Sequence, residues 1–168
     1  MLRLAGAVLV AAGGAWLGFS AAGELRRRER TLRVLLGALD WMERELSFRL
    51  APMPELLGGA ALRTDGPVSD FFAHCRDGLD GLGEKPLALL WREGLRRLEL
   101  DERAAAALEE LGDALGRCDG EGQVRAVGRA RAELDRALDQ AREDRKDIGR
   151  MYRVLGVSAG AVLVILLL

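Results

Sequence analysis

The two uncharged segments at the ends of the chain constrain its fold more than any other feature. Residues 4–23 contain no charged side chain, and as a helix they would rise roughly 30 Å, which matches the hydrocarbon thickness of a bilayer. Residues 154–168 are also uncharged but would rise only roughly 22 Å. A helix there can span the bilayer if it starts at Met151 and ends at Leu168, with flanking arginine side chains that extend to the nearer membrane surface. We therefore predict a transmembrane helix over residues 1–23 and another over residues 151–168.

Positive charge lies at the inner edge of both segments. The flanking residues are Arg26, Arg27, Arg28, Arg30 and Arg33 after the first segment, and Arg150 and Arg153 before the second. Such charge stays on the cytoplasmic side of a membrane, so residues 24–150 are expected in the cytoplasm and both termini on the opposite side. The first cluster also suits binding to anionic lipid headgroups. An alternative stays open: a signal peptide cleaved near Ala22 would export a soluble helical bundle that binds a ligand.

Residues 24–150 predict a single all-α domain. Apolar residues recur there at spacings of three, four or seven, and no segment alternates as a strand does. We expect one helix from Leu25 to just before Pro52, and five more that begin near Pro54, Ser69, Pro86, Asp101 and Gln123. Thiols and imidazole are scarce, and we expect Cys75 and Cys118 as reduced, buried thiols and His74 in or beside the core. Short connections make a six-helix antiparallel bundle, flanked by the two transmembrane helices, the economical arrangement.

The composition argues against several classes of function. The formal net charge is −1 although 30% of the residues are charged, so no basic surface is available to hold a nucleic acid. Two cysteines and one histidine are too few for a Cys/His zinc site. No phosphate-binding loop and no nucleophile with a neighbouring base can be recognised. We therefore predict a non-enzymatic protein that uses neither a cofactor nor a metal.

Several short motifs occur in an order that resembles the stage III sporulation protein AB family, and the likeness covers essentially the whole chain. The motifs are the Leu2–Phe19 segment, Glu43-x-Glu45-Leu46 leading to Ala51-Pro52-Met53, Trp91, Leu111-Gly112, Leu115-Gly116, Asp119, Gln123, and the ending from Leu155-Gly156 to Leu168. The stretch from Leu111 to Gln123 is the most specific of them. Each motif alone is a weak signal, whereas their order together with an anchor at each end is distinctive.

The resemblance implies a component of the mother-cell membrane around the forespore, within the complex that joins the two cells during engulfment. Its partners would be other membrane proteins of the stage III sporulation A operon. The family's cytoplasmic domain is similar to the helical domains of the type II secretion inner-membrane platform protein F. It is thought to dock a cytoplasmic secretion-type ATPase, the AA protein of the same operon. This chain has one helical domain and two anchors in place of that platform's duplicated arrangement.

The corner between the last two helices of the domain is the predicted docking surface for the ATPase. Its candidate residues are Glu109, Glu110, Asp113, Arg117, Asp119, Glu121 and Gln123. Charged groups on such a corner would select a partner by electrostatic complementarity. Asp119 also has a purely structural explanation, because a carboxylate at this position can accept backbone N–H groups at the start of the last helix.

Overall fold

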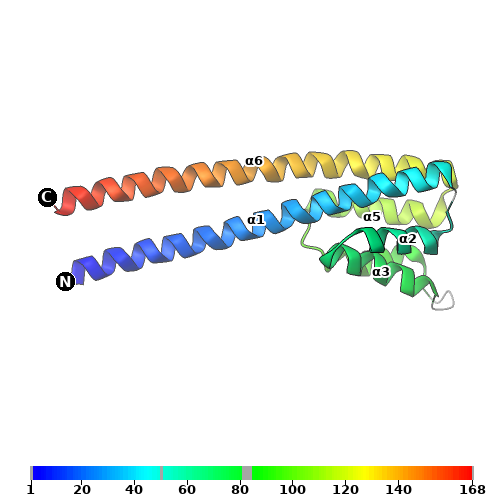
Figure 1. The fold of residues 1–168 in the computed structure, drawn as a ribbon, viewed down its shortest axis with the longest axis horizontal. Coiled ribbons are helices and arrows are strands. Elements are labelled where there is room, and N and C mark those ends of the chain that lie inside the picture. The colour runs from blue at the N-terminus through cyan, green and yellow to red at the C-terminus, as the bar shows by residue number, and fades with distance from the viewer. Residues whose placement is uncertain (1, 50, 81–84, 168) are drawn as a thin grey trace. The chain divides into compact units, whose positions relative to one another are not determined.

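In a computed structural model, the chain consists of helices joined by short non-helical connections over the backbone that is described. The structure describes the backbone of residues 2–49, 51–80 and 85–167, and the side chains of residues 23–49, 51–79, 85–147 and 151. Over that backbone it contains six α-helices and no strand, which confirms the all-α prediction (Figure 1). The helices are α1 (Leu2–Phe48), α2 (Met53–Arg63), α3 (Gly66–Asp80), α4 (Leu87–Leu95), α5 (Glu102–Arg117) and α6 (Gly120–Leu167).

The chain divides into two compact units. The first comprises residues 1–29 and 140–168, and the second comprises residues 30–139. Among the side chains that the structure describes, none of the helices has a stretch both long and apolar enough to span a bilayer. Apart from Gly23 and Met151, the side chains of the two predicted transmembrane segments lie outside the described residues. The predicted spans and the predicted domain boundaries therefore remain predictions.

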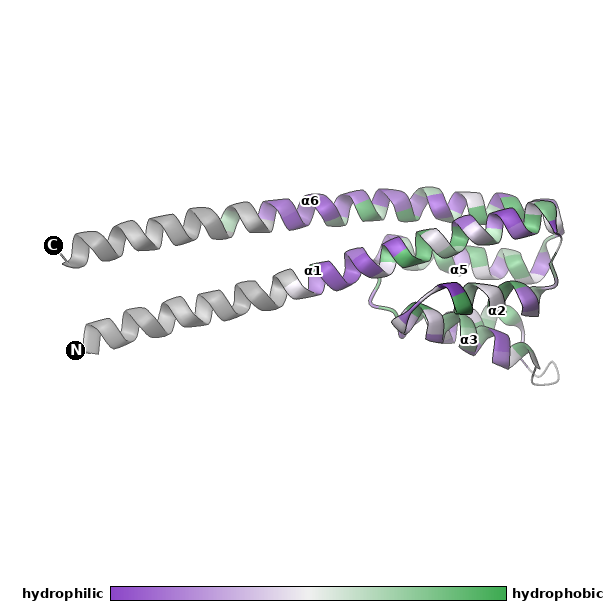
Figure 2. Cartoon of the chain, viewed as in Figure 1, coloured by the Kyte–Doolittle hydropathy of each residue, from purple (hydrophilic) through white to green (hydrophobic). Residues whose placement is uncertain are grey.

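In the second unit, α1 contributes a stripe of buried side chains to the core. Leu32, Leu35, Leu39 and Met42 have no exposed surface, and their spacing of three or four residues keeps them on one face of the helix. Leu36 also continues the apolar spacing from Leu32, but it is half-exposed, and Leu35 is the buried residue of the pair. Figure 2 shows hydrophobic residues recurring between hydrophilic ones along this part of α1. The packing of leucines against the other helices therefore selects the face of α1 that turns inward.

Proline and glycine mark where the short helices begin. Pro52 and Pro86 occupy the cap positions of α2 and α4, where a missing N–H costs nothing because no helical acceptor is available for it. The predicted helix start near Ser69 is wrong. α3 begins at Gly66, whose φ of +58° is a conformation that glycine adopts without strain. The Ser69 hydroxyl instead donates a hydrogen bond of 2.9 Å to the carbonyl of Ala61, which ties α3 to α2.

Trp91 joins three helices at the centre of the second unit. Its side chain is fully buried, and the rings of Phe71 and Phe72 meet it edge-on with centroids 4.8 and 6.1 Å away. The indole N–H donates to the carbonyl of Leu108 at 2.7 Å, which satisfies a polar group that would be costly to bury alone. A Cβ placed on Gly112 would lie 2.4 Å from the Trp91 Cδ1 atom. Only a glycine there allows α5 to approach α4 this closely.

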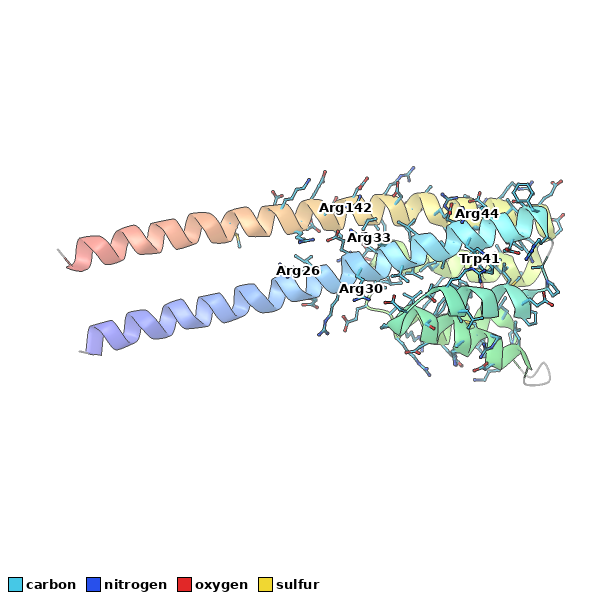
Figure 3. All side chains as sticks on the ribbon, viewed as in Figure 1. Arg26, Arg30, Arg33, Trp41, Arg44 and Arg142 are labelled. Carbon is cyan, nitrogen blue, oxygen red and sulfur yellow. The ribbon has the colours of Figure 1, made fainter. Side chains whose placement is uncertain are left out.

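Ion pairs connect the two long helices within the second unit. Arg131 on α6 pairs with Glu43 on α1 and lies 3.2 Å from Asp40. Trp41, on the same part of α1, stacks beneath the guanidinium group of Arg63 on α2 at 4.4 Å, and Figure 3 labels it beside α2. These contacts join segments far apart in the sequence, so helix periodicity alone did not predict them.

Candidate docking surface

The corner where α5 passes into α6 is held in place by side-chain hydrogen bonds at both helix ends. Oδ1 of Asp119 accepts a hydrogen bond of 2.9 Å from the amide of Gly122, so the predicted capping role is confirmed. α6 begins at Gly120 instead of around Gln123. The Gln123 side chain instead donates to the carbonyls of Leu115 at 3.0 Å and Cys118 at 3.2 Å. Gln123 thus satisfies carbonyls at the end of α5 that the helix itself leaves without donors, a role that sequence reasoning missed.

The seven predicted docking residues do not form a single cluster. Glu109 is exposed and has no ion pair among the described residues. Glu110 lies 3.8 Å from Arg129, whereas the carboxylate of Asp113 receives two hydrogen bonds of 2.9 Å from Arg92. The remaining members, Arg117, Asp119, Glu121 and Gln123, lie at or just beyond the end of α5. Neighbouring arginines therefore neutralise part of the acidic charge that the sequence placed on this surface.

Two grooves border α5 in the second unit. The larger has a volume of about 760 Å³ and lies where α2 and α4 begin and α5 ends. Asp113 and Arg117 line it. The smaller has a volume of about 260 Å³, lies between α5 and α6, and is lined by Glu110 and Arg129 among alanines. The structure thus places Asp113 and Arg117 on one groove and Glu110 on the other. Asp119, Glu121 and Gln123 lie at the corner between α5 and α6, and Glu109 lies in the middle of α5, outside both linings.

The arginines predicted to flank the membrane differ in their surroundings. Arg26 and Arg27 are exposed, and Arg28 is half-buried. Arg30 donates a hydrogen bond of 2.5 Å to Asp65. Figure 3 labels Arg26, Arg30 and Arg33 along α1. The side chains of the other two predicted members, Arg150 and Arg153, lie outside the described residues.

A buried carboxylate in the first unit forms an ion pair that the sequence did not reveal. Glu29 is only 7% exposed, and it accepts a hydrogen bond of 2.8 Å from Arg145. Burying an ionised carboxylate is costly unless a cation and hydrogen bonds compensate it. Arg145 belongs to the charged run of residues 142–147, yet it makes this specific contact with α1. Glu29 was overlooked because it lies within a run of arginines.

The thiols and the histidine occupy three different environments. Cys75 is fully buried, and desolvation raises the pKa of its thiol to about 12, so it stays protonated as a structural residue, as predicted. Cys118 is exposed, which makes its expected burial wrong. The His74 side chain is 27% exposed and its Nε2 lies 3.9 Å from a Glu93 oxygen, at the predicted core boundary. Among the described residues, no three His, Cys, Asp or Glu side chains converge as metal ligands would.

Three comparisons with known proteins find the same family. The family described as stage III sporulation protein AB matches residues 3–168. Stage III sporulation protein AB of Bacillus subtilis (strain 168) is 28% identical over 172 residues, and the match covers the full length of both chains. A solved structure of stage III sporulation protein AB is similar to this one with a TM-score of 0.64 and 25% identity. That match covers 71% of this chain and 97% of the solved chain.

Proposed function

The chain belongs to the stage III sporulation protein AB family, and from this premise we propose that it is a non-enzymatic membrane platform that docks a cytoplasmic secretion-type ATPase. The second unit, residues 30–139, would carry the docking surface in the cytoplasm. The two chain ends would anchor it in the mother-cell membrane around the forespore, with both termini on the opposite side. Its other partners would be the remaining membrane proteins of the stage III sporulation A operon.

Anchoring is supported by the charge pattern at the ends of the chain. Residues 4–23 and 154–168 carry no charge, whereas Arg26 and Arg27 just beyond the first segment are exposed. Exposed arginines next to an apolar segment suit the cytoplasmic headgroup region, where each gains about 1 kcal/mol from anionic lipid. The same residues would oppose transfer of the helical unit across the membrane.

The observation that carries the docking proposal is a pair of exposed carboxylates on a helix fixed at both ends. Glu109 and Glu110 lie in the middle of α5 and are both exposed. The Asp101 carboxylate caps the start of this helix by accepting a hydrogen bond of 2.6 Å from the amide of Ala104, and the Gln123 side chain donates hydrogen bonds to the carbonyls at its end. A surface already held in position loses little conformational entropy when a partner binds, and its charges select that partner by complementarity.

A non-enzymatic role fits the chemistry of the described side chains. The nucleophile of a thiol enzyme is a thiolate with a lowered pKa, whereas the pKa of buried Cys75 is raised to about 12. Asp101 and Asp119 act as helix caps, Asp113 pairs with Arg92, and Glu93 pairs with Lys85. These are structural uses of charge, and they suit a scaffold whose task is to hold a surface in place.

Retention of the ATPase by the full-length protein tests the docking proposal. The two proteins would be produced together, extracted from membranes with detergent and purified through a tag on this chain, and the wild type should retain the ATPase. The double variant Glu109→Lys, Glu110→Lys should retain far less. The matched control is Asp70→Lys, Glu99→Lys, which alters the net charge equally at two exposed positions away from α5. A wild-type chain that retains no ATPase would contradict the proposed function.

Cys118 provides a direct test of the proposed topology. It is exposed whereas Cys75 is buried, so a membrane-impermeant maleimide can reach only Cys118 in the folded wild-type protein. We expect no labelling of intact cells and full labelling after the membrane is permeabilised. Labelling of Cys118 in intact cells would place the helical unit on the outer side and favour export.

A further inference from the structure

The larger groove of the second unit has an apolar side that no other part of the described unit covers. Leu89 lies in the first turn of α4 and is 40% exposed, whereas Leu87 and Leu90 beside it are buried. Pro54 and Pro86 are exposed residues of the same lining. The large apolar side chain of Leu89 faces an open groove of about 760 Å³. A partner that covered it would gain favourable free energy by removing apolar surface from water.

The charged side chains of this groove are predominantly cationic. Lys85, Arg92 and Arg117 line it, against the single carboxylate of Asp113. Arg92 is bound to Asp113 at 2.9 Å, and Lys85 is bound at 3.0 Å to Glu93, which lies outside the lining. The exposed guanidinium group of Arg117 has no ion pair among the described residues. Arg117 is therefore the cation of this groove that remains available to an incoming carboxylate.

The helix ends around the groove reinforce this polarity. α2 and α4 both begin there, and neither has a side-chain hydrogen bond at its cap, so their first-turn amides keep a partial positive charge. α5 ends there and would contribute the opposite charge. Its last carbonyls, however, accept hydrogen bonds from Gln123 and from the amide of Cys118. Glu55 lies in the first turn of α2 and offsets the positive end of that helix, whereas the first turn of α4 has no acidic residue. The open positive helix end at the groove is therefore that of α4, while the negative end of α5 is satisfied.

We propose that this groove binds an acidic segment of the ATPase that carries a large apolar side chain. The apolar side chain would pack on Leu89, Pro54 and Pro86, and carboxylates on either side of it would meet Arg117 and the amides at the start of α4. The identity of the partner rests on the proposed function, whereas the chemistry of the segment follows from the groove alone. This contact is separate from the one at Glu109 and Glu110, and it requires the opposite charge on the partner.

Two groove variants, each with a matched control, test this proposal in the full-length protein in detergent. Leu89→Asp removes the apolar contact and places a carboxylate in the first turn of α4, where it favours the helix. Arg117→Glu reverses the available charge. The controls are Leu62→Asp, at a leucine that is 83% exposed on α2 outside the groove, and Arg103→Glu, at an exposed arginine near the start of α5.

The dissociation constant for the ATPase is the first readout. Each groove variant should weaken binding by about tenfold or more, as truncation of a contact at the centre of an interface does. Both controls should bind as the wild type does. Raising the ionic strength should weaken binding of the wild type more than binding of Arg117→Glu. Salt screens the attraction between Arg117 and the carboxylates of the segment, and the variant lacks this attraction. If the wild type binds and both groove variants bind equally well, the groove proposal is wrong while the proposed function stands.

Overlapping peptides that cover the ATPase sequence provide a second readout. Peptides with net negative charge and a large apolar residue should bind the wild-type protein and lose affinity for Leu89→Asp. Binding confined to basic peptides would overturn the proposal, since the cationic groove could not be their site. A wild-type protein that binds neither the ATPase nor its peptides would instead count against the proposed function itself.

Discussion

Replacing Gly112 with alanine should destabilise the second unit, although the same change usually stabilises a helix. Gly112 is a buried residue of α5, one turn after Leu108. The added Cβ would lie 2.4 and 2.5 Å from the Cδ1 and Cγ atoms of Trp91 and 3.0 Å from its Cβ. An ordinary contact begins at 3.4 Å. To relieve the overlap, α5 or the indole must therefore move by about 1 Å, which is a large shift in a close-packed core.

The expected cost can be estimated from three contributions. Alanine gains about 1 kcal/mol over glycine inside a helix. Inserting a methyl group where no space exists costs about 1–3 kcal/mol, and Trp91 cannot yield cheaply because it is fully buried against Phe71 and Phe72. Any shift also strains the hydrogen bond from the indole to Leu108, which contributes about 1 kcal/mol. The net loss in the free energy of unfolding should be about 2 kcal/mol.

Thermal unfolding of the full-length protein in detergent measures this loss. For a domain of about 100 residues, 2 kcal/mol corresponds to a fall in the midpoint of roughly 10 °C. Gly116→Ala is the matched control on the same helix, because its new Cβ would lie 3.9 Å from the Leu87 Cβ, an ordinary contact. This control should unfold at or slightly above the wild-type temperature. If Gly112→Ala were as stable as Gly116→Ala, the argument that glycine is required beside Trp91 would be refuted.

Three further predictions concern a cap, an ion pair and a thiol. Asp101→Ala removes the acceptor for a first-turn amide of α5 and should lower the free energy of unfolding by about 1 kcal/mol in the same thermal assay; an unchanged midpoint would count against the cap. Arg145→Met leaves the buried carboxylate of Glu29 with one partner fewer and should lower the free energy of unfolding by about 1–3 kcal/mol. Adding Glu29→Gln to this variant should recover part of the lost stability. A double variant no more stable than Arg145→Met would contradict this prediction. A thiol reagent should detect Cys118 alone in the folded protein and Cys75 only in denaturant. Burial raises the pKa of Cys75 from 9.0 to about 12, so above about pH 9 the folded state keeps a proton that the unfolded state loses. The free energy of unfolding should therefore fall as pH rises above about 9. A free energy of unfolding that stays constant over this alkaline range would contradict the prediction.

The helices of the second unit were largely predictable because their signals are local. Pro52, Pro86 and Asp101 mark the starts of α2, α4 and α5, and each acts through its own backbone or through an amide three residues away. The predictions were wrong where two nearby residues fitted the same local pattern about equally well. Leu35 and Leu36 both continue the apolar spacing of α1, and Gly66 as well as Ser69 can begin α3.

The docking residues were predictable as a segment but not as a surface. Sequence reasoning selected the stretch from Glu109 to Gln123 for its motif and its charge. It did not show that Asp113 would be neutralised by Arg92, because these residues lie on different helices. Helical spacing places Leu87, Leu90 and Trp91 on one face of α4 and leaves Leu89 off it. The groove that Leu89 lines could not be read from that spacing, because it is formed together with residues of other helices.

By itself, the amino-acid sequence determined the uncharged ends, the helical character of the region between them and the turns that separate the helices. Each of these depends on composition or on residues within a few positions of one another. The tertiary structure alone decided the pairing of Arg131 with Glu43, of Arg145 with Glu29, and the groove beside Leu89. Such contacts depend on how each helix is rotated about its axis, and that rotation is set by the fit of buried side chains such as Trp91 against residues distant in the chain.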